Sequence, residues 1–297
     1  QLIIDRLTLN AGPLDFAAWD RFIDDFENPV DEVNVALVGK YVDLPDAYKS
    51  LNEALQHAAA HTKTRVNTHF LDAEHLERVG LSLLDGMDAI LVPGGFGNRG
   101  TEGKISAIRH AREQQIPFLG ICLGMQLAVV EFARNVAGMP AAHSTEFDTD
   151  TPDPVIAMIT EWTNRDGSRE LRDGSVDMGG TMRLGGQRCL LREHSRAREL
   201  YQQSEIVERH RHRYEFNPGY VEKLESSGLQ LTGQSVLDSL VEIVELPDHP
   251  WFFGCQYHPE FTSNPRDGHP LFSSFIEAAK QQHYVQQTAA TADAGSA

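Results

Sequence analysis

The stretch Ile116-Pro117-Phe118-Leu119-Gly120-Ile121-Cys122-Leu123-Gly124-Met125-Gln126 joins a short apolar run, a cysteine between two glycines and the start of a helical pattern. This order predicts a buried strand over residues 116–121 that turns sharply into a helix. Glycines permit such a strained turn, so we expect the thiol of Cys122 to be lifted to the end of a sheet. The N-terminus of the following helix would then point at the sulfur and favour its thiolate form.

A second polar segment lies far downstream and reads Gln256-Tyr257-His258-Pro259-Glu260. Residues i and i+2 at a strand end face the same way, so Glu260 can orient His258. Together with Cys122 they supply the nucleophile, base and orienting carboxylate that acyl transfer requires. A free cysteine alone is more often an inert core residue. The turn, the His-Pro-Glu run and the upstream pair Gly94-Gly95 favour the catalytic interpretation.

The remaining sequence predicts an α/β fold. Near-continuous apolar strands alternate with helices, which indicates a central, mostly parallel sheet with helices on both faces. From residue 155 onward, strand-like pieces joined by Gly-rich turns indicate an antiparallel extension that flanks this sheet. The expected strands are 33–38, 65–70, 89–92, 116–121, 155–160, 187–191, 206–213, 229–235, 241–246 and 252–256, and the expected helices are 48–61 (with Asp46 as N-cap), 104–115, 123–136 and 270–282.

Composition narrows the class of protein. Lys and Arg number 26 and Asp and Glu 43, a net charge of −17 that argues against a nucleic-acid-binding surface. No apolar run is long enough to span a membrane, so we expect no membrane partner. The three cysteines have no metal-ligand spacing, which predicts no metal site and a reducing, cytoplasmic location without disulfides. Cys189 and Cys255 lie in strand-like runs, and we expect them in the core.

The runs GICLGMQ (120–126) and YHPE (257–260) resemble class I, triad-type glutamine amidotransferases. The runs VGKY (38–41), PDAYKS (45–50), VPGGFG (92–97), MGGTMRLG (178–185) and ERHRHRYE (208–215) resemble one branch of that family, over about residues 33–279. In that branch the glutaminase is joined to a synthetase that aminates a pyrimidine nucleotide. The resemblance implies hydrolysis of L-glutamine through a thioester on Cys122.

Residue chemistry and the resemblance together suggest a substrate site. The oxyanion requires two preorganised N–H groups, one from Leu123, after the nucleophile, and one from Gly94 or Gly95. The resemblance favours Gly95. The guanidinium of Arg213 suits the α-carboxylate of glutamine. The resemblance adds Glu146, for the α-ammonium, and Gly94, Gln126 and Tyr214 as further glutamine-binding positions.

The arginines of residues 209–213 allow two interpretations. By strand alternation Arg209, Arg211 and Arg213 share one face and the two histidines share the other. From the residues alone, an anion site and a solvated charged edge are equally good interpretations.

In the resembling branch, GTP activates glutamine hydrolysis as an allosteric effector. The loops that carry Lys40, Tyr41, Phe96 and Arg99 occupy the place of the regulatory lid in that branch. Phe96 could stack on a guanine, and Lys40 or Arg99 could meet phosphates. The alternative is that Phe96 is a hydrophobic lid residue and that the two cations are surface charges.

The resemblance also implies what this chain does not carry. We expect residues 1–31 to be an interdomain linker remnant, 32–285 the amidotransferase domain and 286–297 a disordered tail, with mobile loops at 149–154 and 164–174. An N-terminal synthetase domain would bind ATP, Mg²⁺ and UTP, and the complete enzyme would be a homotetramer. No cofactor is expected in this chain itself. The alternatives are a free-standing γ-glutamyl hydrolase and a catalytically idle regulatory module.

Overall fold

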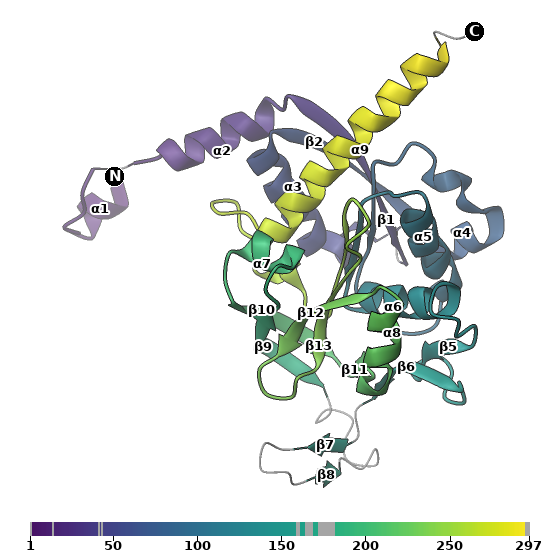
Figure 1. Ribbon diagram of the computed structural model, residues 1–297. Coiled ribbons are helices and arrows are strands. Elements are labelled where there is room, and N and C mark those ends of the chain that lie inside the picture. Colours follow the sequence, from purple (N-terminus) through teal and green to yellow (C-terminus); the bar gives the residue numbers. More distant parts are fainter. Residues whose placement is uncertain are drawn as a thin grey trace.

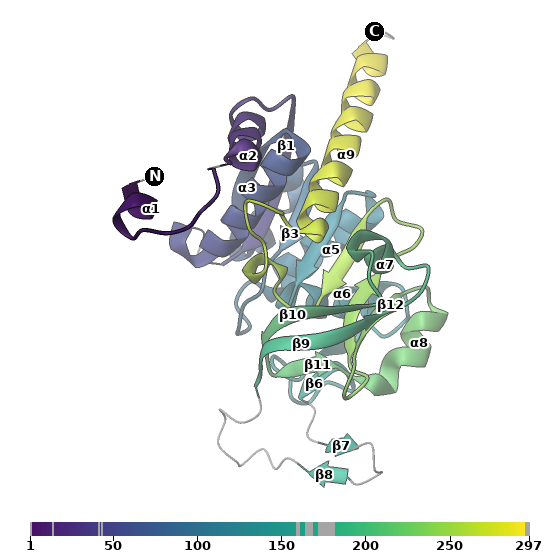
Figure 2. The same cartoon turned by 90° about the vertical axis from the view of Figure 1, so that its left-hand side faces the viewer.

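The computed structural model describes residues 2–13, 15–40, 42, 44–158, 161–163, 169–171 and 182–294. Figures 1 and 2 show how its elements are arranged. In chain order they are α1 (Leu2–Arg6), α2 (Ala17–Glu27), β1 (Asp31–Gly39), the 3-10 turn η1 (Pro45–Tyr48), α3 (Lys49–Thr62), β2 (Thr64–Asp72), α4 (Ala73–Val79), η2 (Leu81–Leu84), β3 (Ala89–Val92), α5 (Thr101–Glu113), β4 (Phe118–Ile121), α6 (Leu123–Asn135), β5 (Ala142–Ser144), β6 (Asp153–Met158), β7 (Glu161–Thr163), β8 (Arg169–Leu171), β9 (Arg183–Leu191), α7 (Arg196–Tyr201), β10 (Glu205–His212), β11 (Tyr214–Phe216), η3 (Pro218–Tyr220), α8 (Val221–Ser226), β12 (Gln230–Ser235), β13 (Val241–Glu245), β14 (Phe252–Cys255), η4 (Pro259–Phe261) and α9 (Pro270–Ala294).

A nine-stranded sheet in the order β10-β9-β12-β13-β14-β4-β3-β1-β2 forms the centre of the structure. The half from β14 to β2 pairs in parallel, and the half from β10 to β14 pairs antiparallel. The predicted α/β class with an antiparallel extension is therefore confirmed. The assignment of residues 155–160 to that extension is wrong, because β6 pairs with β5 and β11 in a separate three-stranded sheet. Residues 159 and 160 lie outside the described part of the chain.

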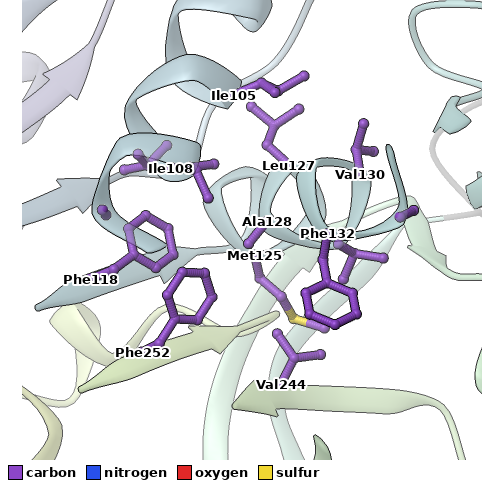
Figure 3. Packing of buried hydrophobic residues seen from close by; sticks show 14 of the residues in the cluster. Ile105, Ile108, Phe118, Met125, Leu127, Ala128, Val130, Phe132, Val244 and Phe252 are labelled. Carbon is purple, nitrogen blue, oxygen red and sulfur yellow. The ribbon is translucent and has the colours of Figure 1, made fainter. Parts of the chain in front are cut away.

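Helices cover both faces of the sheet, because its central strands are apolar on both sides. On one face α5 and α6 pack over side chains such as Phe118 and Phe252, whose ring centroids are 4.5 Å apart (Figure 3). On the other face α3, α7 and α9 pack over the alternate side chains of the same strands, among them Leu37, Leu119 and Phe253. The strands that carry the candidate site are thus held in a fully buried layer.

Several element boundaries differ from the predicted ones. Asp46 is not the N-cap of α3, since it lies inside η1 and Tyr48 takes that place. The final helix does not end at residue 282 but runs to Ala294. The disordered tail predicted for residues 286–297 is therefore wrong for residues 286–294. Alanine is the strongest helix former, and Gln286 and His283 bond to Met87 and Asp88 near β3.

Three other predicted segments differ in how much of them the structure describes. The loop predicted at 149–154 leads directly into β6, and Thr151 donates to the carbonyl of Ala141 at 2.7 Å. The loop predicted at 164–174 lies outside the described residues apart from β8, which pairs with β7. The segment assigned as a linker contains α1 and α2, and the ring of Phe22 lies 5.9 Å from that of His61 on α3. Its role as a linker stays a prediction.

The parallel pairing decides where the candidate site lies. Because β1, β3, β4 and β14 run in the same direction, the segments that leave their carboxyl ends meet at one edge of the sheet. These segments begin with Lys40, Pro93, Cys122 and Gln256. Across the described ranges, no helix combines the length and apolar character needed to cross a membrane.

Candidate active site

The predicted turn between strand and helix is confirmed, and the strain lies on the cysteine itself. Cys122 sits between β4 and α6 with φ 52° and ψ −103°, a backbone conformation that costs energy for a residue with a side chain. Its N–H donates to the carbonyl of Cys255 at 2.7 Å, which ties the turn to β14. Strain of this kind at a tightly held position is typical of a functional site.

The two flanking glycines are required for close approach rather than for unusual φ angles. A Cβ on Gly124 would lie 2.0 Å from the carbonyl oxygen of Val92, and one on Gly120 would lie 2.7 Å from the carbonyl carbon of Gly124. Helix α6 therefore packs against β3 and β4 at backbone distance, which only glycine allows. This packing aims the N-terminus of α6 at the edge of the sheet where Cys122 lies.

His258 and Glu260 lie beside Cys122 and complete a hydrogen-bonded triad. Glu260 Oε1 lies 2.7 Å from His258 Nδ1, and the imidazole bonds to the side chain of Cys122. Burial by itself lowers the pKa of His258, but the bonds to Cys122 and Glu260 outweigh it and raise that pKa to about 10. The geometry therefore favours an imidazolium next to the sulfur. Glu260 reaches the ring from the turn η4, not from the strand end that the sequence suggested.

The segment that carries His258 is anchored on both sides. The N–H of His258 donates to the carbonyl of Arg209 on β10 at 2.8 Å. Thr262, just after the triad, donates to Glu208 Oε2 at 2.8 Å, and His269 Nε2 lies 2.9 Å from Glu208 Oε1. Glu208 is 3% exposed and also accepts from the hydroxyl of Tyr201 at 3.0 Å. Glu208 was not predicted to support the triad.

The other two cysteines differ from Cys122, as predicted. Cys189 and Cys255 are fully buried, and burial raises the pKa of each thiol above its usual value. Both therefore stay neutral thiols within the core. Among the described residues, no three His, Cys, Asp or Glu side chains are grouped so that they could hold a metal ion.

The predicted oxyanion donors lie in two segments that adjoin Cys122. Gly94 and Gly95 follow β3, and Leu123 begins α6, where the first backbone N–H groups have no partner within the helix. A Cβ on Gly94 would lie 2.7 Å from His258 Cε1, whereas one on Gly95 would lie 3.6 Å from Leu123 Cδ2. The structure brings both segments to Cys122, and their role as N–H donors stays a prediction.

Two of the predicted glutamine-binding side chains, Gln126 and Glu146, are held by hydrogen bonds to neighbouring segments. Gln126 Nε2 donates to the carbonyl of Tyr214 at 2.9 Å, and Glu146 accepts from the N–H of Gly97 at 3.0 Å. Arg213 lies in the bend between β10 and β11, near Glu146. Burial raises the pKa of the Glu146 carboxyl, and the positive charge of Arg213 partly opposes that rise. Buried Lys104, on α5, lies near the same carboxylate and was not predicted. Burial lowers the pKa of Lys104 to about 8.

Of the predicted lid residues, Phe96 lines an open cavity of about 210 Å³ beside the triad. Phe96 is 52% exposed in it, and the guanidinium of Arg211 lies 5.9 Å above the centre of the Phe96 ring. Lys40 is buried and donates to the carbonyls of Phe96 and Gly97, so it holds this loop. Arg99 pairs with Glu74 at 3.0 Å, and Tyr41 lies outside the described residues.

Strand β10 resolves part of the question raised by the arginine run. Arg209 and Arg211 are exposed, while His210 and His212 are buried on the opposite face, as alternation predicts. Arg211 reaches the cavity next to the triad, and Arg213 lies beyond the end of the strand. The arginines therefore do not form one surface stripe.

This arrangement of strand, cysteine turn and histidine–glutamate pair defines a class of enzyme. The chain belongs to the class I glutamine amidotransferase family, whose profile, "Glutamine amidotransferase class-I", matches residues 43–278. It is similar to the glutaminase domain of CTP synthase (CTPS) from Trypanosoma brucei, solved with bound acivicin. The two are 37% identical, the similarity covers 84% of this chain and 94% of that one, and the TM-score is 0.74.

More distant structures were also found. A glutamine amidotransferase from Thermotoga maritima is 12% identical, with 84% of this chain and 97% of that chain covered and a TM-score of 0.44. A glutamine amidotransferase from Methylobacillus flagellatus is 12% identical, with 86% and 94% covered and a TM-score of 0.45.

Proposed function

We propose that this chain is the glutaminase domain of a CTP synthase. It would hydrolyse L-glutamine and supply ammonia to a synthetase domain that aminates UTP to CTP. The observation that carries the glutaminase activity is the hydrogen-bonded series Cys122–His258–Glu260 at a strained turn. The similarity to the T. brucei glutaminase domain supports the assignment to CTP synthase among the amidotransferases.

The first half of the reaction forms a thioester. The Cys122 thiolate attacks the carbonyl carbon of the side-chain amide, and the carbonyl oxygen takes up the negative charge. The N–H groups of Leu123 and Gly95 would receive that oxyanion. The C–N bond then breaks while His258, held as an imidazolium, gives its proton to the departing nitrogen. Ammonia leaves, and the γ-glutamyl group stays on the sulfur.

The second half regenerates the enzyme. His258 is now neutral and takes a proton from a water molecule that attacks the thioester carbonyl. The C–S bond breaks, glutamate leaves, and the sulfur returns to a thiolate beside the newly protonated imidazole. Glu260 keeps the ring in one orientation through the 2.7 Å contact in both halves.

Recognition of free glutamine rests on the polar groups beside α6. Arg213 would bind the α-carboxylate, and Glu146 would accept from the α-ammonium. Gly94, Gln126 and Tyr214 would complete the site. The grouping of Glu146 with three cations, Lys40, Lys104 and Arg213, supports this proposal, because it places a half-buried carboxylate near a guanidinium.

The complete enzyme would need groups that this chain does not supply. ATP and Mg²⁺ would activate the 4-oxygen of UTP for replacement by ammonia, in an N-terminal synthetase domain of a cytoplasmic homotetramer. GTP would act as an allosteric activator at the cavity beside the triad. The exposed ring of Phe96 beneath Arg211 supports a site for a flat base there.

Replacement of the nucleophile tests the proposal. We expect Cys122→Ala to abolish ammonia release from glutamine and labelling by iodoacetamide at this position. A complete enzyme with the same change should still make CTP from added ammonia, since the synthetase would be intact. Glutamine-dependent turnover in the variant would exclude the triad assignment. Hydrolysis of γ-glutamyl peptides in preference to glutamine would favour a γ-glutamyl hydrolase instead.

A further inference from the structure

A fully buried amide side chain touches the candidate nucleophile. Gln256, the first residue after β14, is 0% exposed, and its Nε2 lies 3.7 Å from Cys122 Sγ. Its backbone N–H donates to the carbonyl of Glu242 at 2.8 Å, which holds the residue against β13. In the sequence, Gln256 is notable only as the first residue of the run that contains His258.

The orientation of this amide follows from its partners. The carbonyl oxygen of Tyr214 can only accept, so the atom of Gln126 that lies 2.9 Å from it must be the nitrogen. The same nitrogen lies 3.1 Å from the Gln256 amide, which must therefore present its oxygen there. The NH₂ group of Gln256 is then left facing the sulfur. The series Tyr214–Gln126–Gln256–Cys122 runs in one direction, with every donor paired to an acceptor.

A neutral donor at this place has a chemical consequence. A thiolate accepts hydrogen bonds far better than a thiol or a thioester, because bonds to charged groups are about twice as strong as neutral ones. The donor therefore stabilises the sulfur when it is charged, before attack and again when it leaves the thioester. The titratable groups near the sulfur are His258, Glu260 and Cys255, while Arg211 lines the adjoining cavity. Gln256 adds a contact that none of these supplies.

We propose that Gln256 is a further catalytic residue, whose amide N–H donates to the Cys122 thiolate while Gln126 and the Tyr214 carbonyl hold that amide in the donating orientation. This inference rests on the proposed function, because it requires Cys122 to be the nucleophile. It assigns Gln126 a second task besides contact with the substrate. It also connects the glutamine-binding side of α6 directly to the sulfur.

The test is the pH dependence of Cys122 alkylation by iodoacetamide, which requires neither substrate nor a synthetase domain. Gln256→Met keeps the length of the side chain but removes the donor, and Gln256→Glu places a carboxylate against the sulfur. We expect the midpoint of the alkylation profile to move to higher pH by about one unit in Gln256→Met. The shift in Gln256→Glu should be larger. The matched control Gln234→Glu adds the same charge at an exposed position of β12 and should leave the midpoint unchanged.

A third variant keeps the test decisive if a change at Gln256 prevents folding, which thermal unfolding would reveal. Gln126→Met leaves Gln256 in place but removes the donor that orients it, and should move the midpoint in the same direction by a smaller amount. Ammonia release should fall mainly through kcat in the folded Gln256 variants, whereas Gln126→Met should also raise KM, because Gln126 belongs to the proposed glutamine site.

Two results separate this inference from the proposed function. If the wild-type protein is active and the folded variants show an unchanged alkylation midpoint, the role of Gln256 is overturned while the proposed function stands. A wild-type protein with neither selective labelling of Cys122 nor ammonia release would overturn the proposed function and this inference with it.

Discussion

At the scale of single residues, the candidate site is made by close contacts around one sulfur atom. Cys122 is held at a positive φ by its bond to Cys255, and His258 fits against the backbone of Gly94. A side chain at position 94 would therefore displace the imidazole. Such tight placement of the nucleophile and base is what makes small steric changes costly for catalysis.

The contact between Gly94 and His258 predicts the effect of one added methyl group. In Gly94→Ala the new Cβ would lie 2.7 Å from His258 Cε1 and 3.5 Å from Cys122 Cβ. We expect kcat for glutamine hydrolysis to fall about 100-fold, because the ring must shift by a large fraction of an ångström. Gly12→Ala, where no atom lies within 4 Å, is the control and should be silent. A fully active Gly94→Ala variant would mean that the imidazole has an alternative productive position.

The proposed carboxylate contact predicts a change in substrate affinity. Arg213→Ala should raise KM for glutamine about 10-fold to 100-fold, since a hydrogen bond to a charged group contributes about 1.5–3 kcal/mol. The free energy of unfolding should change much less. Arg209→Ala, on the exposed face of β10, is the control. An unchanged KM in Arg213→Ala would move the carboxylate contact to Arg209 or Arg211.

At the scale of elements, β10 connects two different surroundings. Its outward side chains include Arg209 and Arg211, and its inward ones include Glu208, His210 and His212. Burial and the nearby Arg183 lower the pKa of His210 to about 3, so this ring stays neutral in the core. The strand therefore places a polar but uncharged pair of histidines beneath the triad, and a carboxylate that holds the triad segment.

Loss of that carboxylate should destabilise the elements it joins. In Glu208→Ala the side chains of Tyr201, Thr262 and His269 lose a buried acceptor. We expect the free energy of unfolding to fall by about 3–5 kcal/mol, measured by urea denaturation. Glu208→Gln, which keeps one accepting oxygen, should lose less. The exposed Glu222→Ala on α8 serves as the control, and an equal, small effect in both alanine variants would contradict the anchoring role.

At the scale of the whole molecule, the parallel half of the sheet gathers distant segments at one edge. Lys40 after β1, Gly94 after β3, Cys122 after β4 and His258 after β14 meet there, although they span most of the chain. The cavity beside them is lined by Phe96 and Arg211 and by residues 46–51 of η1 and α3. A group bound in this cavity would contact both the lid residues and the triad.

The proposed regulation by GTP can be tested on the chain as a whole. An effector shifts an equilibrium only by its differential interaction with two states. In the proposed enzyme, part of that interaction would come from the synthetase domain. We therefore expect the chain alone to fold and to be labelled at Cys122, but to hydrolyse glutamine slowly and with little response to GTP. The measurement is ammonia release with and without GTP, by this chain and by the same chain joined to the synthetase domain. Full GTP-stimulated activity of the chain alone would show that the regulatory site is self-contained.

The features that the sequence alone determined are those written in adjacent residues. Four buried strands and the turn at Cys122 follow from short apolar runs and two glycines, because burial and backbone approach are local requirements. The pairing of His258 with Glu260 was predicted from their spacing of two residues on a strand end, although Glu260 reaches the ring from the turn η4. These features sufficed to predict the α/β class, the antiparallel extension and the residues of the triad.

Only the tertiary structure decided which side chains meet across the chain. Gln256 and Cys122 are far apart in sequence, as are Glu208 and Thr262, and no local pattern indicates that their atoms touch. The same holds for β6, which joined a separate sheet, and for α9, whose extension depends on contacts near β3 as well as on its alanines. A hydrogen bond depends on distance and direction between two atoms, and those are set only when the strands that carry them have taken their order in the sheet.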